Sequence, residues 1–84
     1  MLNMIRRNLY MNMQYTESFN IPTGGWTGGA SGILNGTTAG ITADIRLWRD
    51  NSATAARRVS LAPGEILPVK VRYVNHNSTV TGFN

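Results

Sequence analysis

Residues 57–74 read RRVSLAPGEILPVKVRYV, and this stretch decides the fold. Apolar and polar side chains alternate on both sides of Pro63-Gly64. This pattern predicts two β-strands joined by a turn, because successive side chains of a strand point to opposite faces. Pro68 cannot donate a ladder hydrogen bond, so it is expected at a strand start or a sheet edge. The two strands are expected to bury one apolar face, formed by Val59, Leu61, Leu67, Val69, Val71 and Tyr73.

The length of 84 residues predicts one small domain. A chain of this size buries only about 60–65% of its unfolded surface, so its own core is thin. The sequence has no cysteine and a single histidine, His76, which removes disulfides and argues against a protein-built metal site. We therefore expect additional stability from association with copies of itself or with a larger body.

The chain carries a net charge of +4, but only 14% of its residues are charged. Nucleic-acid binders usually cluster their basic side chains, whereas here these residues are spread along the chain. We interpret the charge as a mild attraction to acidic surfaces. No apolar stretch approaches the roughly 18 residues of a membrane helix, and no secretory leader is evident, so neither a membrane location nor secretion is expected.

Residues 1–16 form an ambiguous N-terminal segment. Its apolar residues fit a helix face near the start of the chain and a strand face further on. We favour a strand over residues 8–16, preceded by an extended apolar arm. The arm is expected either to pack on a neighbouring subunit by strand addition or to fold back on its own sheet. The apolar side chains of this segment include Leu2, Ile5, Leu9, Met11, Met13 and Tyr15.

Seven of the nine glycines fall in residues 23–40. A phosphate-binding loop would need a lysine in the spacing G-x-x-x-x-G-K-[ST], and no lysine stands in that position. The segment therefore predicts a long glycine-rich surface loop. Such a loop is entropically costly to fix, so Trp26 is expected to anchor it on the domain or on a partner. Asn35-Gly36 within it is typical of a tight turn.

Residues 41–49 alternate strictly and predict a strand with Trp48 on its polar face. We favour Trp48 as an interface anchor, because a small domain cannot cover both faces of a sheet. A last short strand is expected over residues 79–83, and His76 is expected to be solvated in the preceding polar turn. These patterns predict an all-β fold of about five or six strands, a small antiparallel sandwich or barrel with residues 41–84 as its core.

The acidic residues do not define a catalytic site. Residues of this kind on strands more often offset arginines across a sheet. No G-x-S-x-G nucleophile motif is present. We therefore predict a protein without enzymatic activity, cofactor or bound metal. The four acidic residues are Glu17, Asp44, Asp50 and Glu65.

A motif in the C-terminal third has the form V-x-L-x-x-G-E-x-L-P-V and is followed by a Val/Arg alternation and a closing Thr- and Gly-containing segment. It comprises Val59, Leu61, Gly64, Glu65, Leu67, Pro68, Val69, Thr79 and Gly82. This pattern resembles small structural proteins of tailed bacteriophages. The resemblance implies a non-enzymatic virion component: a capsid decoration (cement) protein, or a small tail, spike or head–tail component. Decoration proteins of this kind are similar to compact β domains with extended arms, often trimeric, seated between capsomers.

The expected partners follow from this resemblance and from the thin core. They are the major capsid protein or other virion proteins, and copies of the chain itself, in a virion assembled in the host cytoplasm. Contacts through the arm and the glycine-rich loop would stabilise the shell. The residues expected at the interface are Leu2, Ile5, Leu9, Met11, Met13, Tyr15, Trp26 and Trp48.

The alternative function is that of a basic small barrel that binds single-stranded nucleic acid. Basic residues and exposed aromatic rings would provide a groove with stacking platforms. The alternation of residues 67–73 places Tyr73 on the face opposite Lys70 and Arg72, so nucleic acid is not the expected partner. The candidate residues are Arg46, Trp48, Lys70, Arg72 and Tyr73.

Overall fold

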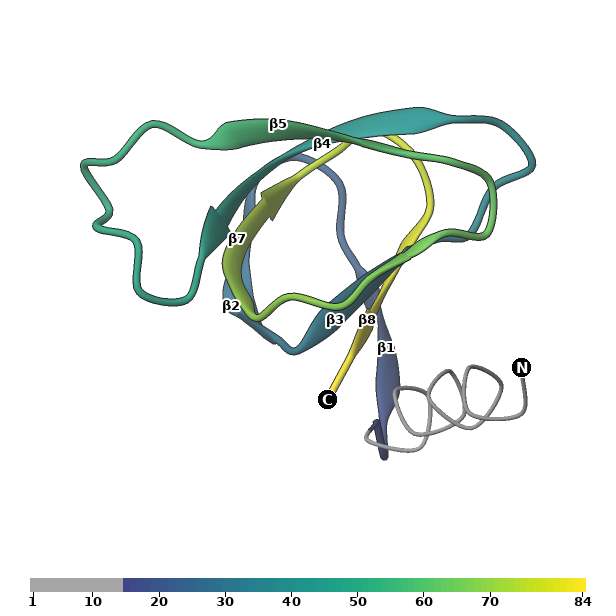
Figure 1. Cartoon of the computed structure of the whole chain (residues 1–84), viewed down its shortest axis with the longest axis horizontal. Helices are drawn as coiled ribbons and strands as arrows, with labels where there is room; N and C mark the ends of the chain where they lie inside the picture. Colours follow the sequence, from purple (N-terminus) through teal and green to yellow (C-terminus); the bar gives the residue numbers. More distant parts are fainter. Residues whose placement is uncertain (1–14) are drawn as a thin grey trace, which may run out of the picture.

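The computed structural model describes residues 15–84, which form eight strands and no helix (Figure 1). The all-β prediction is confirmed, with more strands than the alternation indicated. The predicted arm and most of the predicted strand over residues 8–16 lie outside the described residues. The strands are β1 (Ser18–Ile21), β2 (Trp26–Ala30), β3 (Gly32–Asn35), β4 (Ile41–Leu47), β5 (Arg57–Leu61), β6 (Ile66–Leu67), β7 (Val71–Asn75) and β8 (Val80–Phe83).

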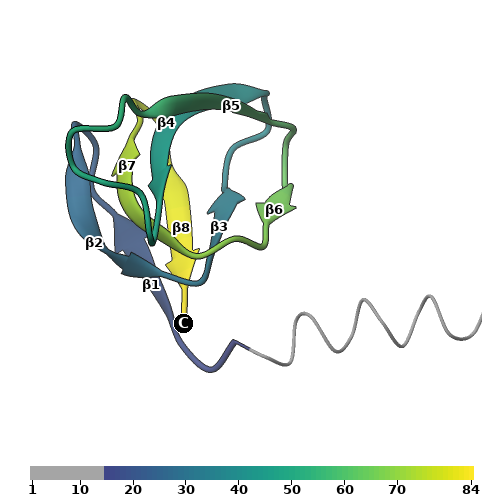
Figure 2. The same cartoon turned by 60° about the vertical axis from the view of Figure 1, so that its left-hand side comes forward.

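The eight strands form two antiparallel sheets of four strands, packed as a sandwich. The first sheet has the order β1-β8-β3-β6, and the second sheet has the order β2-β7-β4-β5. The chain crosses repeatedly from one sheet to the other, and Figure 2 shows the strands wrapping around a common interior. The predicted strands over residues 41–49 and 79–83 are confirmed as β4 and β8.

The core lies between the two sheets and is almost entirely aliphatic. Inward-facing residues alternate with outward-facing ones along each strand, as in other sandwiches. The aromatic rings of Phe19 and Trp26 pack against this core from its periphery. The largest apolar side chains that are fully buried are Ile21, Ile33, Leu61, Val71, Val74 and Val80.

The predicted turn at Pro63-Gly64 is confirmed, but the predicted strand pair around it is wrong. Gly64 adopts a φ of 72°, and the Glu65 amide donates to the Ala62 carbonyl over 3.0 Å. The expected second strand is split into β6 and β7, which belong to different sheets, and β5 pairs with β4 instead. The interruption falls at Pro68, which has no N–H with which to continue a ladder.

A β-bulge in β7 changes which side chains face the core. Arg46 of β4 pairs with Tyr73, and Leu47 pairs with Val71, so Arg72 is an extra residue in β7. The extra residue reverses the alternation, so Val71 and Val74 are both fully buried. The prediction that Tyr73 shares the buried face of Val71 is therefore wrong, since its ring lies under an arginine of the outer face.

The glycine-rich segment is not the long loop that its composition predicted. Much of it forms β2 and β3, and its glycines allow aromatic rings to lie against the backbone. A Cβ on Gly28 would collide with the Trp26 ring, and a Cβ on Gly29 would lie 3.2 Å from the Trp48 ring. Strand glycines often mark such close approaches, which composition alone does not distinguish from a loop.

Asn35 does not form the predicted exposed tight turn with Gly36. Its side chain is completely buried at the end of β3. The Nδ2 group donates to the carbonyls of Ala39 over 2.8 Å and Leu61 over 3.0 Å, and Oδ1 accepts from the Thr37 amide over 2.9 Å. Asn35 therefore ties the turn before β4 to the end of β5.

His76 is buried, which contradicts the expectation of a solvated turn residue. Its exposed fraction is 3%. The Ser78 amide donates to Nδ1 over 3.1 Å, and Nε2 lies 2.8 Å from the Ile21 carbonyl oxygen. Because Nδ1 must accept, the hydrogen of a neutral ring is on Nε2, which donates to Ile21. His76 thus links the end of β1 to the turn between β7 and β8.

Candidate interaction surface

Two adjacent large apolar side chains are exposed at the end of β4. The exposed fractions of Leu47 and Trp48 are 43% and 47%, and these are the large apolar residues that residues 15–84 leave in solvent. Tryptophan exposed beside another apolar residue is typical of protein interfaces, where tryptophan often contributes much of the binding energy. The end of β4 is therefore a candidate binding surface.

Backbone contacts fix Trp48 in this position. Its amide donates to the Lys70 carbonyl over 2.9 Å, which holds the end of β4 beside the start of β7. The carboxylate of Asp50 accepts from the Leu47 amide over 2.8 Å and closes the turn that follows. The indole therefore projects from a defined strand end.

The indole lies between a basic side chain and the backbone of β2. The Nζ atom of Lys70 is 4.6 Å from the centroid of the Trp48 ring, within the range of a cation–π contact. Gly29 leaves room for the ring on the β2 side. This contact orients the Lys70 ammonium group, which remains exposed to solvent.

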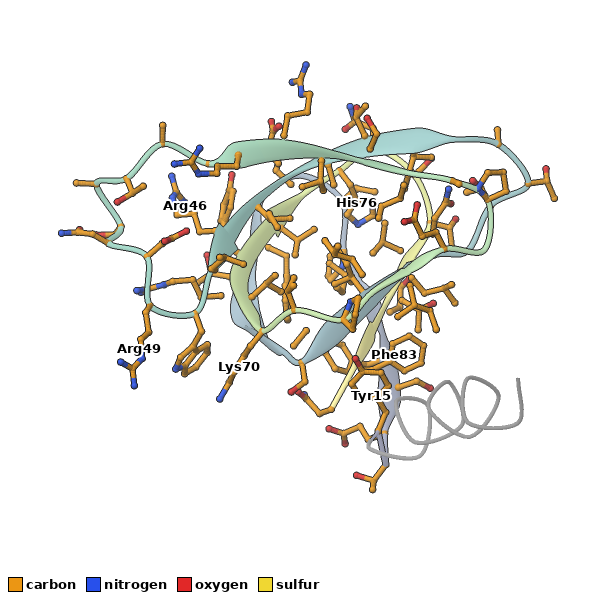
Figure 3. All side chains as sticks on the ribbon, in the orientation of Figure 1. Tyr15, Arg46, Arg49, Lys70, His76 and Phe83 are labelled. Carbon is orange, nitrogen blue, oxygen red and sulfur yellow. The ribbon has the colours of Figure 1, made fainter. Side chains whose placement is uncertain are left out.

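Two further basic residues complete what we call the Trp48 patch. Figure 3 shows Arg49 and Lys70 extending into solvent on the same side of the molecule. Arg72 lines the same hollow as Trp48 and donates from Nη1 to the Asp50 carbonyl over 2.9 Å. The Trp48 patch comprises Leu47, Trp48, Arg49, Lys70 and Arg72.

A hollow lies beside the indole. The residues that line it are Thr27, Gly28, Gly29, Trp48 and Arg72. Its volume is about 450 Å³. A hollow lined by an indole, two glycines and one guanidinium can receive a side chain from a partner.

The fold gathers the basic residues that the sequence spreads. All six Lys and Arg residues within residues 15–84 lie in the second sheet or directly beside its strands, together with Asp44 and Asp50, which gives this sheet a net charge of +4. The first sheet has Glu17 and Glu65 beside it and a net charge of −2. The six basic residues are Arg46, Arg49, Arg57, Arg58, Lys70 and Arg72.

Among the members of the predicted interface set that lie within residues 15–84, Trp48 is exposed, and the other two pack on their own domain. The Tyr15 ring stacks on Phe83 with centroids 5.2 Å apart, and its hydroxyl donates to the Ser31 carbonyl over 3.3 Å. The half-buried Trp26 packs beside the core, as one of its two expected roles required. Leu2, Ile5, Leu9, Met11 and Met13 lie outside the described residues.

Leu47 and Arg49 were missed by the sequence analysis. Leu47 belongs to the apolar face of residues 41–49, so alternation assigned it to the core. It is nevertheless exposed, although it pairs with the buried Val71 at the last position of β4. The signal that could have indicated the patch is the pairing of a tryptophan with flanking apolar and basic residues at a strand end.

Three of the four carboxylates within residues 15–84 accept hydrogen bonds inside the domain: Asp44, Asp50 and Glu65. Asp44 accepts from Arg58 Nε over 3.1 Å, and Glu65 accepts from the Ala62 amide over 2.7 Å. The Asp44 contact raises the pKa of Arg58, chiefly through the hydrogen bond and then through its charge. Within this part of the chain, no three His, Cys, Asp or Glu residues are grouped so that they could hold a metal ion.

Residues 15–84 contain no helix long and apolar enough to cross a membrane.

Comparison with known proteins adds no identity to these observations. No protein-family model, no curated protein and no solved structure matches the chain. The geometry of the described residues and the sequence pattern are therefore the basis of the functional argument.

Proposed function

We propose that the chain is a non-catalytic structural subunit of a tailed-phage virion. Its specific role is that of a capsid decoration protein, which binds the major capsid protein and stabilises the head shell. The observation that carries the proposal is the exposed Trp48 patch on a β-sandwich whose described buried side-chain polar atoms all have hydrogen-bond partners. Such a surface favours binding to a macromolecule over chemistry on a small substrate.

The phage-like motif supports the part of this proposal that concerns the fold. Gly64 supplies the positive φ of the turn, and Glu65 caps that turn through its carboxylate. A Cβ on Gly82 would lie 2.7 Å from the Phe19 ring. These motif positions therefore have structural roles. The resemblance concerns the turn after β5 and the packing against β8. The binding role rests on the surface.

Addition of the purified protein to particles that lack it tests this proposal. Shells from a phage genome with this coding sequence deleted are incubated with the protein, sedimented and heated. We expect the protein to sediment with the shells and to raise the temperature at which they release DNA. A protein that stays in the supernatant would contradict a decoration role.

The place within the particle is tested by electron microscopy with an antibody against the chain. Label over the whole head supports the decoration role, whereas label at the tail or neck supports a tail, spike or head–tail component. Deletion of residues 1–8 tests the predicted arm. If the truncated protein decorates shells at full occupancy and with full heat resistance, the arm has no role in attachment.

Binding to single-stranded nucleic acid is the second candidate function, and one observation favours it. The bulge in β7 places Tyr73 on the outer face with Arg46, on the sheet that carries Lys70 and Arg72. This removes the geometric objection raised by the alternation. A gel-shift titration with an oligothymidylate at low and moderate salt is the test, because phosphate contacts give a steep salt dependence.

A further inference from the structure

We propose that the Trp48 patch docks on an acidic protein surface. The indole would be buried at the centre of the contact, and Lys70 and Arg49 would pair with carboxylates around it. This inference deepens the proposed function and rests on it for the identity of the partner as a virion protein. The chemistry of the partner is argued from the patch itself.

The apolar part of the patch indicates a protein partner. Leu47 and Trp48 are adjacent and exposed, and the hollow beside the indole is large enough for a side chain of a partner. Central tryptophans surrounded by arginines are typical of the residues that dominate protein–protein affinity.

The charge of the patch indicates that the partner is acidic. The second sheet has a net charge of +4; the exposed Lys70 lies over the indole, and the exposed Arg49 follows Trp48 in the chain. Lys70 is already oriented by the Trp48 ring, so less side-chain entropy is lost when it pairs with a carboxylate. Complementary charge around an apolar centre gives both specificity and fast association.

The availability of aromatic rings favours protein over nucleic acid. A single strand is bound through several successive rings on which bases stack. One face of the Tyr73 ring is covered by Arg46, whose Nε also donates to the Thr54 carbonyl over 2.8 Å. Within the described residues, Trp48 is the exposed aromatic ring, and Lys70 already lies over it, so no series of free rings is available for successive bases.

Nuclear magnetic resonance of the two indole N–H groups tests the inference in the full chain. The probe is a short glutamate-rich peptide with one leucine, and the matched control has lysines in place of the glutamates. We expect the glutamate peptide to shift the Trp48 indole signal and to leave that of Trp26 unchanged. No shift at Trp48, equal shifts at both indoles, or equal binding of the lysine peptide would overturn the inference.

A pair of charge reversals then locates the contact. Lys70→Glu changes the patch, whereas Arg57→Glu makes the same charge change on the edge strand β5 outside it. We expect Lys70→Glu to weaken peptide binding by at least about tenfold and Arg57→Glu by no more than about twofold. Equal losses of binding would show that the protein responds to net charge alone, and would overturn the inference that the Trp48 patch is the binding site. Tighter binding of an oligothymidylate than of the peptide at the same salt would also overturn it.

Shell binding separates this inference from the proposed function. If the wild-type protein does not bind shells but the peptide selects Trp48, the virion role fails and the acidic docking site stands. If shells bind the wild type, Lys70→Glu and Trp48→Ala equally well, the virion role stands and the docking site fails. Loss of shell binding by both variants, with retention by Arg57→Glu, supports the two together.

Discussion

Arg46 and Tyr73 are paired directly across β4 and β7, and the guanidinium carbon of Arg46 lies 4.4 Å from the centroid of the Tyr73 ring. This contact exists because the extra residue Arg72 turns Tyr73 outward. From the same position, Arg46 Nε donates to the Thr54 carbonyl over 2.8 Å. The pair therefore holds the β4–β5 loop, whose first two residues, Trp48 and Arg49, belong to the Trp48 patch.

The first prediction concerns these contacts of Arg46 with Tyr73 and Thr54, which we call the Arg46 clamp. Arg46→Lys keeps the charge but loses the planar guanidinium and the fixed Nε donor. We expect a loss of about 1–2 kcal/mol in the free energy of unfolding, measured by urea denaturation. Hydrogen exchange of the Thr54 amide should also accelerate. Arg49→Lys is the matched control, because Arg49 is exposed and a surface change of this kind costs less than about 0.5 kcal/mol. Equal stability of the two variants would contradict the clamp.

The second prediction separates two neighbouring glycines. A Cβ on Gly28 collides with the half-buried Trp26 ring, whereas a Cβ on Gly29 meets the exposed Trp48 ring at 3.2 Å. We expect Gly28→Ala to destabilise the fold by about 1–3 kcal/mol, because a packed ring must move. Gly29→Ala should change stability much less but should shift the Trp48 indole resonance. Thermal denaturation and the indole spectrum together distinguish the two, and the reverse ranking would contradict this account.

The composition of residues 23–40 identified an unusual segment but not its structure. A high density of glycine occurs in loops, where glycines form turns, as in the segment after Asn35. It also occurs in strands where the missing side chains leave room for aromatic rings, as at Gly28 and Gly29. The rings in question come from Trp26 and Trp48, and only the fold shows where they lie. Sequence alone therefore located the anchor residue but not its strand.

The sequence pattern of residues 57–74 predicted the turn correctly but predicted the wrong pairing of the strands, and the reason is physical. Period-two patterning states which side chains share a face, but it does not state which strand lies alongside. A single extra residue such as Arg72 reverses the faces beyond it, and no local signal marks the bulge. The outward position of Tyr73 depended on this detail, because only the reversal places its ring beside Arg46 on the outer face.

The third prediction tests the buried amide of Asn35. Its Nδ2 group faces carbonyl oxygens, so Asn35→Asp would place a carboxylate against acceptors. We expect loss of at least about 3 kcal/mol at neutral pH. Asn77→Asp makes the same change at an exposed site and should cost less than about 0.5 kcal/mol. If Asn35→Asp does not fold, Asn35→Ala, expected to cost about 2 kcal/mol, keeps the measurement possible.

The fourth prediction distinguishes the two tryptophans as structural and binding residues. Trp26 packs on the core, so Trp26→Ala should destabilise the fold by about 3 kcal/mol or more. Trp48 is 47% exposed, so Trp48→Ala should cost less than about 1 kcal/mol while it removes partner binding. Urea denaturation measures the first effect and shell sedimentation the second. A large stability loss for Trp48→Ala would indicate that its exposed indole serves the fold.

The fifth prediction concerns the tautomer of His76. The Ser78 amide can only donate, so Nδ1 must accept it, and Nε2 must carry the hydrogen that reaches the Ile21 carbonyl over 2.8 Å. We expect ¹⁵N chemical shifts of a neutral ring protonated at Nε2, and slow exchange of that hydrogen because the ring is buried. His76→Gln retains a donor but cannot place an acceptor at Nδ1 in the same geometry, so it should lose about 1–3 kcal/mol. A ring protonated at Nδ1 would show that the link between β1 and the β7–β8 turn is made in another way.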